Sequence, residues 1–288
     1  MNCKICASSN APVTFLISGG RVPVRRCREC GFTYVQHRVD EMHLETSEHN
    51  LSGVLETYPG NRQKWELRLR LLESLAGPVR GQRILDVGAG GGGWLARARN
   101  AGAVVEGVEF CSTCRSYART EFQLELRTEP LEMEYWRSRA GAFDLVTFWD
   151  VLEHVNDPLA FLADCRRLLA TGGRLMFSTP VRDTWFDRAG ESLNRLSFGR
   201  SDFLLQQRYS HAHLQIFHST QLRRILEDSG ARLLYYRKIH ELTFPVERYF
   251  RNMYGDRPIL KPLARSAEAL LHTLPLANKV LGIAVFTG

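Results

Sequence analysis

Strand-like and helix-like runs alternate along the middle of the chain. The short apolar runs typical of buried strands are Ile84–Val87, Val104–Val108, Phe143–Phe148 and Arg174–Ser178. Helical periodicity between or after them covers residues 94–101, 157–169 and 221–228, and we expect Ser219 to cap the last of these helices. Alternation of this kind predicts a Rossmann-like, doubly wound α/β fold with a mostly parallel sheet and helices on both faces.

The residues before this region have a different pattern of hydrophobic and polar positions, so we expect the chain to form three units. In residues 1–36, two β-like runs, Pro12–Ser18 and Val22–Arg26, lie on either side of a Gly-Gly turn, and a third follows at 31–35. Residues 37–78 are predicted to be a helical linker or cap, in which apolar residues recur from Trp65 to Leu75 in an amphipathic helix that ends at Gly77-Pro78. Residues 79–288 form the sheet domain, and an aromatic-rich stretch at 181–210 reads as an insertion.

Composition narrows the class of protein. The 288 residues are 44% hydrophobic and 24% charged, which is typical of globular proteins. No window holds the roughly 18 consecutive apolar residues of a membrane helix, and the start has no apolar signal core, so we expect a cytoplasmic protein without a transmembrane segment. The net charge is +7, with the basic excess on the flanks, which suits an anionic or nucleic-acid partner.

The seven cysteines are more typical of metal ligands and buried thiols than of disulfides in that compartment. Cys3-x2-Cys6 and Cys27-x2-Cys30 have the spacing of a four-thiolate zinc site. A unit of 36 residues cannot bury a useful core, so we expect a bound metal to stabilise this zinc ribbon. Four protein ligands leave no open position on the Zn²⁺, so its role should be structural. Cys111-x2-Cys114 has no second pair, and we expect it to pack rather than bind metal.

The glycine-rich stretch at 84–93 is the most informative motif. It satisfies both the dinucleotide fingerprint G-x-G-x-x-G and the methyl-donor turn D-x-G-x-G-x-G. Asp86 stands two places before the first glycine, where it would repel a pyrophosphate and attract a ligand that carries an ammonium and a sulfonium. Glu109 ends the next strand and can accept two ribose hydroxyls, a feature that both templates share.

Four segments then agree in order and spacing: the glycine turn, Gly107-Val108-Glu109, Phe143–Val155 and the Gly172-Gly173 turn. Over residues 81–230 the chain resembles the class I S-adenosylmethionine-dependent methyltransferases. The resemblance implies an S-adenosylmethionine site built from Asp86, Gly88, Gly90, Gly92, Glu109, Phe110, Leu131, Trp149 and Asp150. In it, Asp86 and Gly88 would lie beside the methionine moiety, while Trp149 and Asp150 would face the transferred methyl. The cysteine unit is similar to the zinc module of some methyltransferases acting on sugars and small metabolites.

Two histidines are the candidate catalytic residues. His154 follows the fourth-motif strand and could remove a hydroxyl proton from the acceptor as a general base. Asp150, Glu153 and His154 also resemble an acidic-x-x-Glu-His pattern of the ubiquinone O-methyltransferases that has been linked to a metal, and the alternative is that Glu153 and His154 only brace a loop. His213 matches a family His-x-x-x-Phe element and could line the acceptor pocket, whereas we expect His218 to be exposed.

Two functions remain open, and we favour the first. One is transfer of a methyl group to a small-molecule hydroxyl of a sugar, glycan precursor or secondary metabolite, held between the zinc module, Tyr58 and the insertion. The other is modification of RNA or protein, gripped by the zinc module and basic flanks. The segment after the fourth-motif strand lacks the Asn/Asp-Pro-Pro-aromatic clamp of nucleic-acid amino-methylating enzymes and has no cysteine nucleophile. A binding module without catalysis is disfavoured because Asp86 and Glu109 are intact.

Overall fold

The computed structural model describes residues 2–17, 21–35, 58–206, 208–209, 213–241, 246–247, 250–251, 255–273 and 277–286. The strands are β1 (Val13–Ile17), β2 (Val22–Arg26), β3 (Thr33–Val35), β4 (Arg83–Val87), β5 (Val104–Val108), β6 (Phe143–Trp149), β7 (Leu169–Pro180), β8 (Gln215–Ile216), β9 (Ala231–Ile239) and β10 (Lys279–Phe286). The helices are α3 (Tyr58–Ala76), α4 (Gly93–Asn100), α5 (Ser112–Phe122), α6 (Glu134–Arg137), α7 (Pro158–Leu168), α8 (Trp185–Leu196), α9 (Phe203–Gln206), α10 (Ser219–Asp228) and α12 (Leu260–Thr273).

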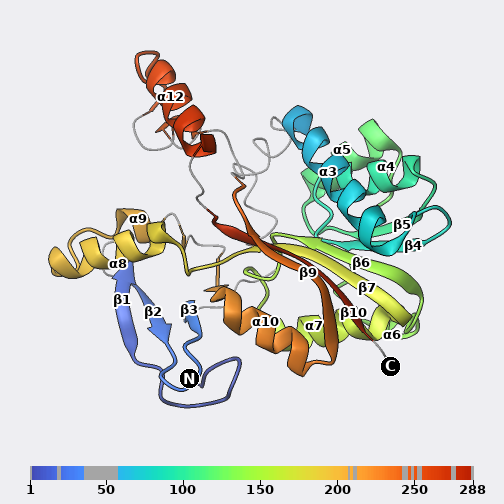
Figure 1. Cartoon of the computed structure of the whole chain (residues 1–288), viewed down its shortest axis with the longest axis horizontal. Helices are drawn as coiled ribbons and strands as arrows, with labels where there is room; N and C mark the ends of the chain where they lie inside the picture. Colours follow the sequence, from blue (N-terminus) through green and yellow to red (C-terminus); the bar gives the residue numbers. More distant parts are fainter. Residues whose placement is uncertain are drawn as a thin grey trace.

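The larger sheet confirms the predicted fold class. Its strand order is β5-β4-β6-β7-β10-β9. β5, β4, β6 and β7 run parallel, and β10 is antiparallel to both of its neighbours, so the sheet is mostly parallel. Helices α3, α4 and α5 cover one face, and α7 and α10 cover the other (Figure 1). Among the described residues, no helix is both long enough and apolar enough to cross a bilayer.

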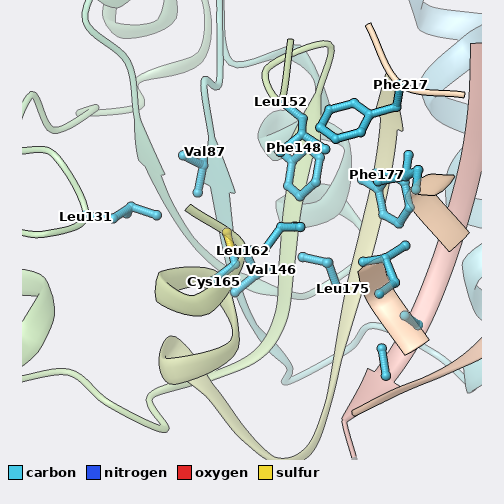
Figure 2. Close-up of a cluster of buried hydrophobic side chains, with 14 of the residues drawn as sticks. Val87, Leu131, Val146, Phe148, Leu152, Leu162, Cys165, Leu175, Phe177 and Phe217 are labelled. Atoms are coloured by element: carbon cyan, nitrogen blue, oxygen red, sulfur yellow. The ribbon is translucent and has the colours of Figure 1, made fainter. Parts of the chain in front are cut away.

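The central strands are apolar without alternation because both of their faces are covered. Leu85, Val146, Phe148, Leu175 and Phe177 are fully buried. Figure 2 shows the core on the α7 side, where the stacked rings of Phe148 and Phe177 lie beside Leu162 of α7. A second cluster on the other face contains Trp94 of α4 and Leu72 of α3. The sheet is therefore fixed from both sides, which holds its strand ends in place.

A smaller antiparallel sheet has the order β1-β2-β3-β8. Its first three strands come from the cysteine unit, and the fourth comes from the segment before α10. Its core joins Phe15, Val24 and Ile216 to Leu205 and Tyr209 of the 181–210 region, which forms α8 and α9. Figure 1 shows α8 and α9 beside the upper end of β1.

The helix α3 covers Tyr58–Ala76 and ends directly before Gly77-Pro78, as the sequence predicts. The predicted start of α10 is wrong. The predicted cap of α10, Ser219, is the first helical residue, because the carboxylate of Asp183 takes both its N–H (2.9 Å) and its hydroxyl (2.7 Å). His218 caps this helix instead by accepting from the N–H of Thr220, and it is half-buried rather than exposed. The side chain of Tyr58 and the residues 37–57 lie outside the described part of the chain.

Candidate active site

Three glycines shape the turn between β4 and α4. Gly88, Gly90 and Gly92 have φ of 71°, 54° and 78°, a left-handed backbone that favours glycine. A Cβ on Gly88 would lie 2.5 Å from Cγ2 of Val151, so that position needs glycine for packing. A Cβ on Gly90 would meet nothing within 4 Å. Open space at the tip of a glycine turn is what a bound ligand needs to approach the backbone.

Asp86 is the next-to-last residue of β4 and is fully buried. Its Oδ1 accepts a hydrogen bond from the hydroxyl of Thr147 (2.6 Å), which in turn accepts from Nε1 of Trp94 (3.0 Å). Its Oδ2 has no hydrogen-bond partner among the described residues. Burial raises the pKa of Asp86 to about 8. A buried carboxylate oxygen without a partner is costly, and a bound ammonium group would satisfy it.

Glu109 follows β5 and lies across the glycine turn. Its Oε2 accepts from the N–H of Gly90 (2.7 Å), and its Oε1 accepts from the N–H of Cys111 (2.8 Å). Phe110 is half-buried beside it. Leu131 instead lies at the edge of the core cluster, on the side of Val87 (Figure 2), and its carbonyl accepts from Arg167 at 2.9 Å. The turn and Glu109 thus lie together, whereas the side chain of Leu131 is occupied in the core.

Sequence reasoning missed Arg68 of α3. This residue is 4% exposed, and its guanidinium lies 4.2 Å from the centre of the Trp149 ring. Nη2 donates to Glu241 (2.8 Å) and Ser178 (3.3 Å), whereas Nη1 has no partner among the described residues. The signal in the sequence was its position: Arg68 stands beside Leu69 and between Trp65 and Leu72, on the apolar stripe of the helix, where a charge needs a reason.

The buried polar atoms fit the amino-acid end of S-adenosylmethionine. Nη1 of Arg68 and Nε1 of Trp149 are donors without acceptors, and Oδ2 of Asp86 is an acceptor without a donor, all among buried or half-buried residues of the described chain. A zwitterion carries one carboxylate and one ammonium, which would satisfy the two kinds of atom. The residues present therefore fit the cofactor that the glycine turn predicts.

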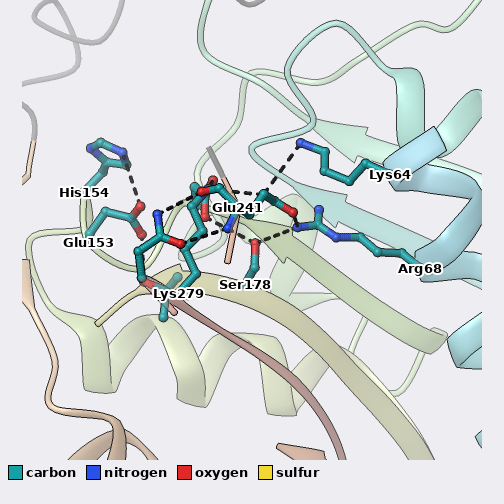
Figure 3. Close-up of polar contacts among 10 residues, drawn as sticks. Lys64, Arg68, Glu153, His154, Ser178, Glu241 and Lys279 are labelled. Atoms are coloured by element: carbon teal, nitrogen blue, oxygen red, sulfur yellow. Dashed lines mark hydrogen bonds and ion pairs between the residues drawn. The ribbon is translucent and has the colours of Figure 1, made fainter. Parts of the chain in front are cut away.

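Asp150 belongs to a buried charge cluster, defined here as Lys64, Arg68, Asp150, Glu241 and Lys279. Lys279 binds the carboxylate of Asp150 and lies 3.2 Å from Glu241, which also binds Arg68 (Figure 3). Although burial alone would raise it, the pKa of Asp150 is held below its usual value by Lys279 and Arg68. Asp150 has a φ of 57°, an uncommon conformation for a residue with a side chain. This cluster fixes the loop that follows β6.

Glu153 and His154 lie in the turn that follows Asp150, and His213, from the segment before β8, lies beside them. One ligand atom from each lies within 4.8 Å of the others, and the two imidazole rings are 4.8 Å apart. Glu153 is 1% exposed and accepts from the hydroxyl of Thr179 at 2.9 Å. Figure 3 shows the ring of His154 turned toward Glu153, with Nε2 3.9 Å from Oε1. Both predicted histidines therefore share one site with Glu153, while Asp150 points to Lys279.

The two neighbours of His154 are in unusual protonation states. Burial and Asp150 raise the pKa of Glu153 to about 8, so this carboxyl is largely protonated at neutral pH. Burial and His154 lower the pKa of His213 to about 3, so that its ring is neutral. Nδ1 of His213 lies 2.7 Å from the carbonyl of Arg208, which can only accept. The proton of His213 is therefore on Nδ1, and Nε2 carries the lone pair.

The four cysteines of the N-terminal unit converge. The Sγ atoms of Cys3 and Cys30, and those of Cys6 and Cys27, are 3.5 Å apart, and all four lie within 4.8 Å of one another. Gly31, directly after the last cysteine, has a φ of 73°. Thiolates bind zinc at about 2.3 Å in a tetrahedron, so sulfurs less than 5 Å apart fit that ion. Cys111 and Cys114 are buried, and Cys111 caps α5 through the N–H of Cys114 (3.2 Å).

Comparison with known proteins agrees with this geometry. A family model described as a methyltransferase domain matches residues 60–236, more than half of the chain. The chain is 30% identical over 177 residues to a ubiquinone biosynthesis O-methyltransferase of Coxiella burnetii (strain Dugway 5J108-111), covering 60% of this chain and 73% of that protein. It is 38% identical over 122 residues to the enzyme of the same name from Bordetella avium (strain 197N), but spans only half of that protein's length and 41% of its own.

A solved structure adds the fold. Magnesium protoporphyrin IX methyltransferase from Synechocystis PCC 6803, with S-adenosylhomocysteine bound, superposes with a TM-score of 0.54 over 86% of this chain and 98% of that one. At 15% identity this likeness shows the architecture alone. The family match, the mostly parallel sheet and the glycine turn with Asp86 and Glu109 lead to one assignment. The chain belongs to the class I S-adenosylmethionine-dependent methyltransferases.

Proposed function

We propose that this methyltransferase acts on a hydroxyl group of a small-molecule acceptor. The observation that carries the proposal is the trio of Glu153, His154 and His213, whose ligand atoms lie within 4.8 Å of one another just after β6. S-adenosylmethionine supplies the electrophilic methyl group. A hydroxyl is a poor nucleophile at neutral pH, and the trio offers a neutral imidazole to take its proton.

The three side chains have different parts in this proposal. His154 is the general base. His213 is neutral and presents the lone pair of Nε2, so it accepts a hydrogen bond from the acceptor and orients it. Glu153 is held by Thr179 and lies beside the ring of His154, where it steadies that ring. We further propose that Arg68, Asp86, Glu109 and the glycine turn hold the cofactor.

The chemical class of the acceptor is also a proposal. The relatives are named as O-methyltransferases of ubiquinone biosynthesis, which favours a small molecule over a macromolecule. A sugar or glycan precursor, neutral or anionic, stays within the same class, as does a secondary metabolite. RNA or protein modification in the cytoplasm remains the alternative, and the basic net charge of +7 is the observation that favours it. In both cases the four cysteines hold a structural Zn²⁺.

Methyl transfer from tritium-labelled S-adenosylmethionine tests the acceptor class. The protein is incubated with three panels: catechols and other phenols, nucleotide-linked sugars, and unmodified transfer RNA. We expect label in a small molecule with a free hydroxyl and none in RNA. Label only in RNA would overturn the proposal.

Variants assayed with a substrate found in this way then test whether His154 is the general base. We expect His154→Ala to lower turnover by about 10²–10⁴-fold with little change in S-adenosylhomocysteine affinity, because a general base contributes on that order. His213→Ala should raise KM more than it lowers kcat. Near-normal turnover of His154→Ala across pH 6 to 9 would contradict the base. Assays with added magnesium and with a chelator are the control, since magnesium-dependent turnover would assign the trio to a metal instead.

A further inference from the structure

The cysteine unit is joined to the histidine site by main-chain pairing. β3 pairs with β8, with Thr33 opposite Ile216 and Tyr34 opposite Gln215. The next rung continues the pairing, because the N–H of Val35 donates to the carbonyl of Leu214 at 2.8 Å. β8 begins two residues after His213. All of the paired residues are at most 1% exposed, so a displacement of β3 must move the segment that carries His213.

Gln215 connects the same unit to the turn that carries Glu153 and His154. Its Nε2 donates to the carbonyls of Leu152 (2.8 Å) and Val155 (2.7 Å), which flank those two residues. Its Oε1 accepts from Nζ of Lys4 at 3.1 Å. Lys4 lies between Cys3 and Cys6, so one fully buried side chain links the first cysteine pair to both ends of the turn.

Packing reinforces this link. Phe32 follows the second cysteine pair, and its ring lies 5.2 Å from that of Phe217. Phe217 lies beside Leu152 and Phe148 in the core of the large sheet (Figure 2). Because a unit of this size cannot order itself by apolar burial, the position of β3 depends on the staple at the four cysteines.

We propose that Gln215 is a positioning residue, and that metal in the cysteine cluster sets the placement of Glu153, His154 and His213 through β3, β8 and Gln215. Naming these side chains as the acceptor site rests on the proposed function, but the linkage does not depend on which acceptor is used. The cofactor residues Asp86, near the end of β4, and Glu109, directly after β5, have no hydrogen bond to the cysteine unit in the part of the chain described. Loss of the metal should therefore displace Glu153, His154 and His213 and leave the cofactor residues Asp86 and Glu109 in place.

Histidine-ring NMR on the full chain tests the linkage without an acceptor. Protein labelled with ¹³C-histidine is compared with its metal and after treatment with a chelator and a thiol-binding mercurial, with His154→Gln and His213→Gln assigning the two signals. We expect both signals to shift and broaden when metal is removed, while calorimetry shows less than a twofold change in S-adenosylhomocysteine affinity. Unchanged signals would overturn the proposal. A parallel loss of cofactor affinity would also overturn it, because the metal would then stabilise the whole fold.

Two glutamine variants separate the link from the metal. Gln215→Leu removes the side-chain hydrogen bonds to the carbonyls of Leu152 and Val155 and keeps the main-chain bonds to the carbonyl of Glu153, whereas Gln221→Leu removes only a bond from α10 to the carbonyl of Cys30 (2.9 Å). With metal content equal in both, Gln215→Leu should shift the His154 and His213 signals and lower kcat at least tenfold, and Gln221→Leu should do neither. Equal behaviour of the two variants would refute the role of Gln215. If the signals move but His154→Ala keeps its turnover, the proposed base fails while the linkage stands.

Discussion

At the scale of single residues, Glu109 is the sharpest test of the cofactor site. It accepts two backbone N–H bonds and lies across the turn where Gly90 leaves open space. We propose that it holds the ribose of the cofactor, so replacing it with alanine should remove the acceptor for two ribose hydroxyls, each hydrogen bond being worth roughly 1.5–3 kcal/mol. We expect Glu109→Ala to weaken S-adenosylhomocysteine binding by at least about 100-fold in calorimetry. Glu106→Ala on the same strand, whose carboxylate binds Arg139, is the matched control and should bind normally. Heat from NAD but not from S-adenosylhomocysteine would reverse the assignment.

The raised pKa of Asp86 predicts that the protein releases a proton when the cofactor binds. Its pKa of about 8 means that the carboxyl is mostly protonated at pH 7 in the free protein. A bound ammonium favours the charged carboxylate, so binding should expel close to one proton, and affinity should rise as pH increases from 6 to 8. Calorimetry in phosphate and in Tris measures this release from the difference in apparent heat. Asp86→Asn has no proton to give, and an equal release from that variant would exclude Asp86 as the source.

Local spacing made part of this site readable from the sequence. Asp86, the glycines and Glu109 lie within one β-turn-α-β unit, so their order along the chain fixes their neighbourhood. His154 and His213 were also singled out, although their contact, 59 positions apart, could not be derived from the sequence. Arg68 was missed because its partner Glu241 lies 173 residues away, and no local period records such a pair.

At the scale of elements, the cysteine unit should require its metal. We expect one zinc per chain through Cys3, Cys6, Cys27 and Cys30, because such small units gain most of their folding energy from the ion. Chelation should unfold β1 to β3, seen as fast hydrogen exchange, and leave S-adenosylhomocysteine binding in place. Cys27→Ser should lose the zinc, whereas Cys111→Ser should keep it. Freshly purified protein without zinc would contradict this expectation.

Element length decided which strands the sequence could reveal. β4, β5 and β6 are mostly apolar runs of five to seven residues between turn signals, and the sequence pattern predicts all three. β8 has only two residues, too few for any period, and its pairing with β3 joins positions about 180 apart. The position of β10 between β7 and β9, antiparallel to both, could not be predicted either. A buried apolar run looks the same whether its strand pairs parallel or antiparallel to its neighbours.

At the scale of the whole molecule, the buried charge cluster joins α3, which precedes the strands of the large sheet along the chain, to β10, the last of those strands. Arg68 comes from α3, Lys279 begins β10, and both bind Glu241. The net contribution of such a cluster is small when it is complete, since desolvation offsets attraction, but removing one member leaves charges buried without a partner. The cluster therefore predicts an asymmetry: the intact protein gains little from it, and a single deletion costs a great deal.

Lys279→Met should lower the free energy of unfolding by about 3–5 kcal/mol at pH 7, because Asp150 and Glu241 lose their shared cation. Arg119→Met is the control: its partner Glu125 and Arg119 itself are 72% and 65% exposed, so the cost should stay below about 1 kcal/mol. Lys279 holds the pKa of Asp150 down, a contribution that is present above the unfolded pKa and lost as pH falls. Because the folded pKa of Asp150 lies below its usual value near 4, the gap between wild type and Lys279→Met should narrow as pH falls below about 4 in urea titrations. A gap that is constant with pH, or equal losses in the two variants, would show that Lys279 acts through packing rather than charge.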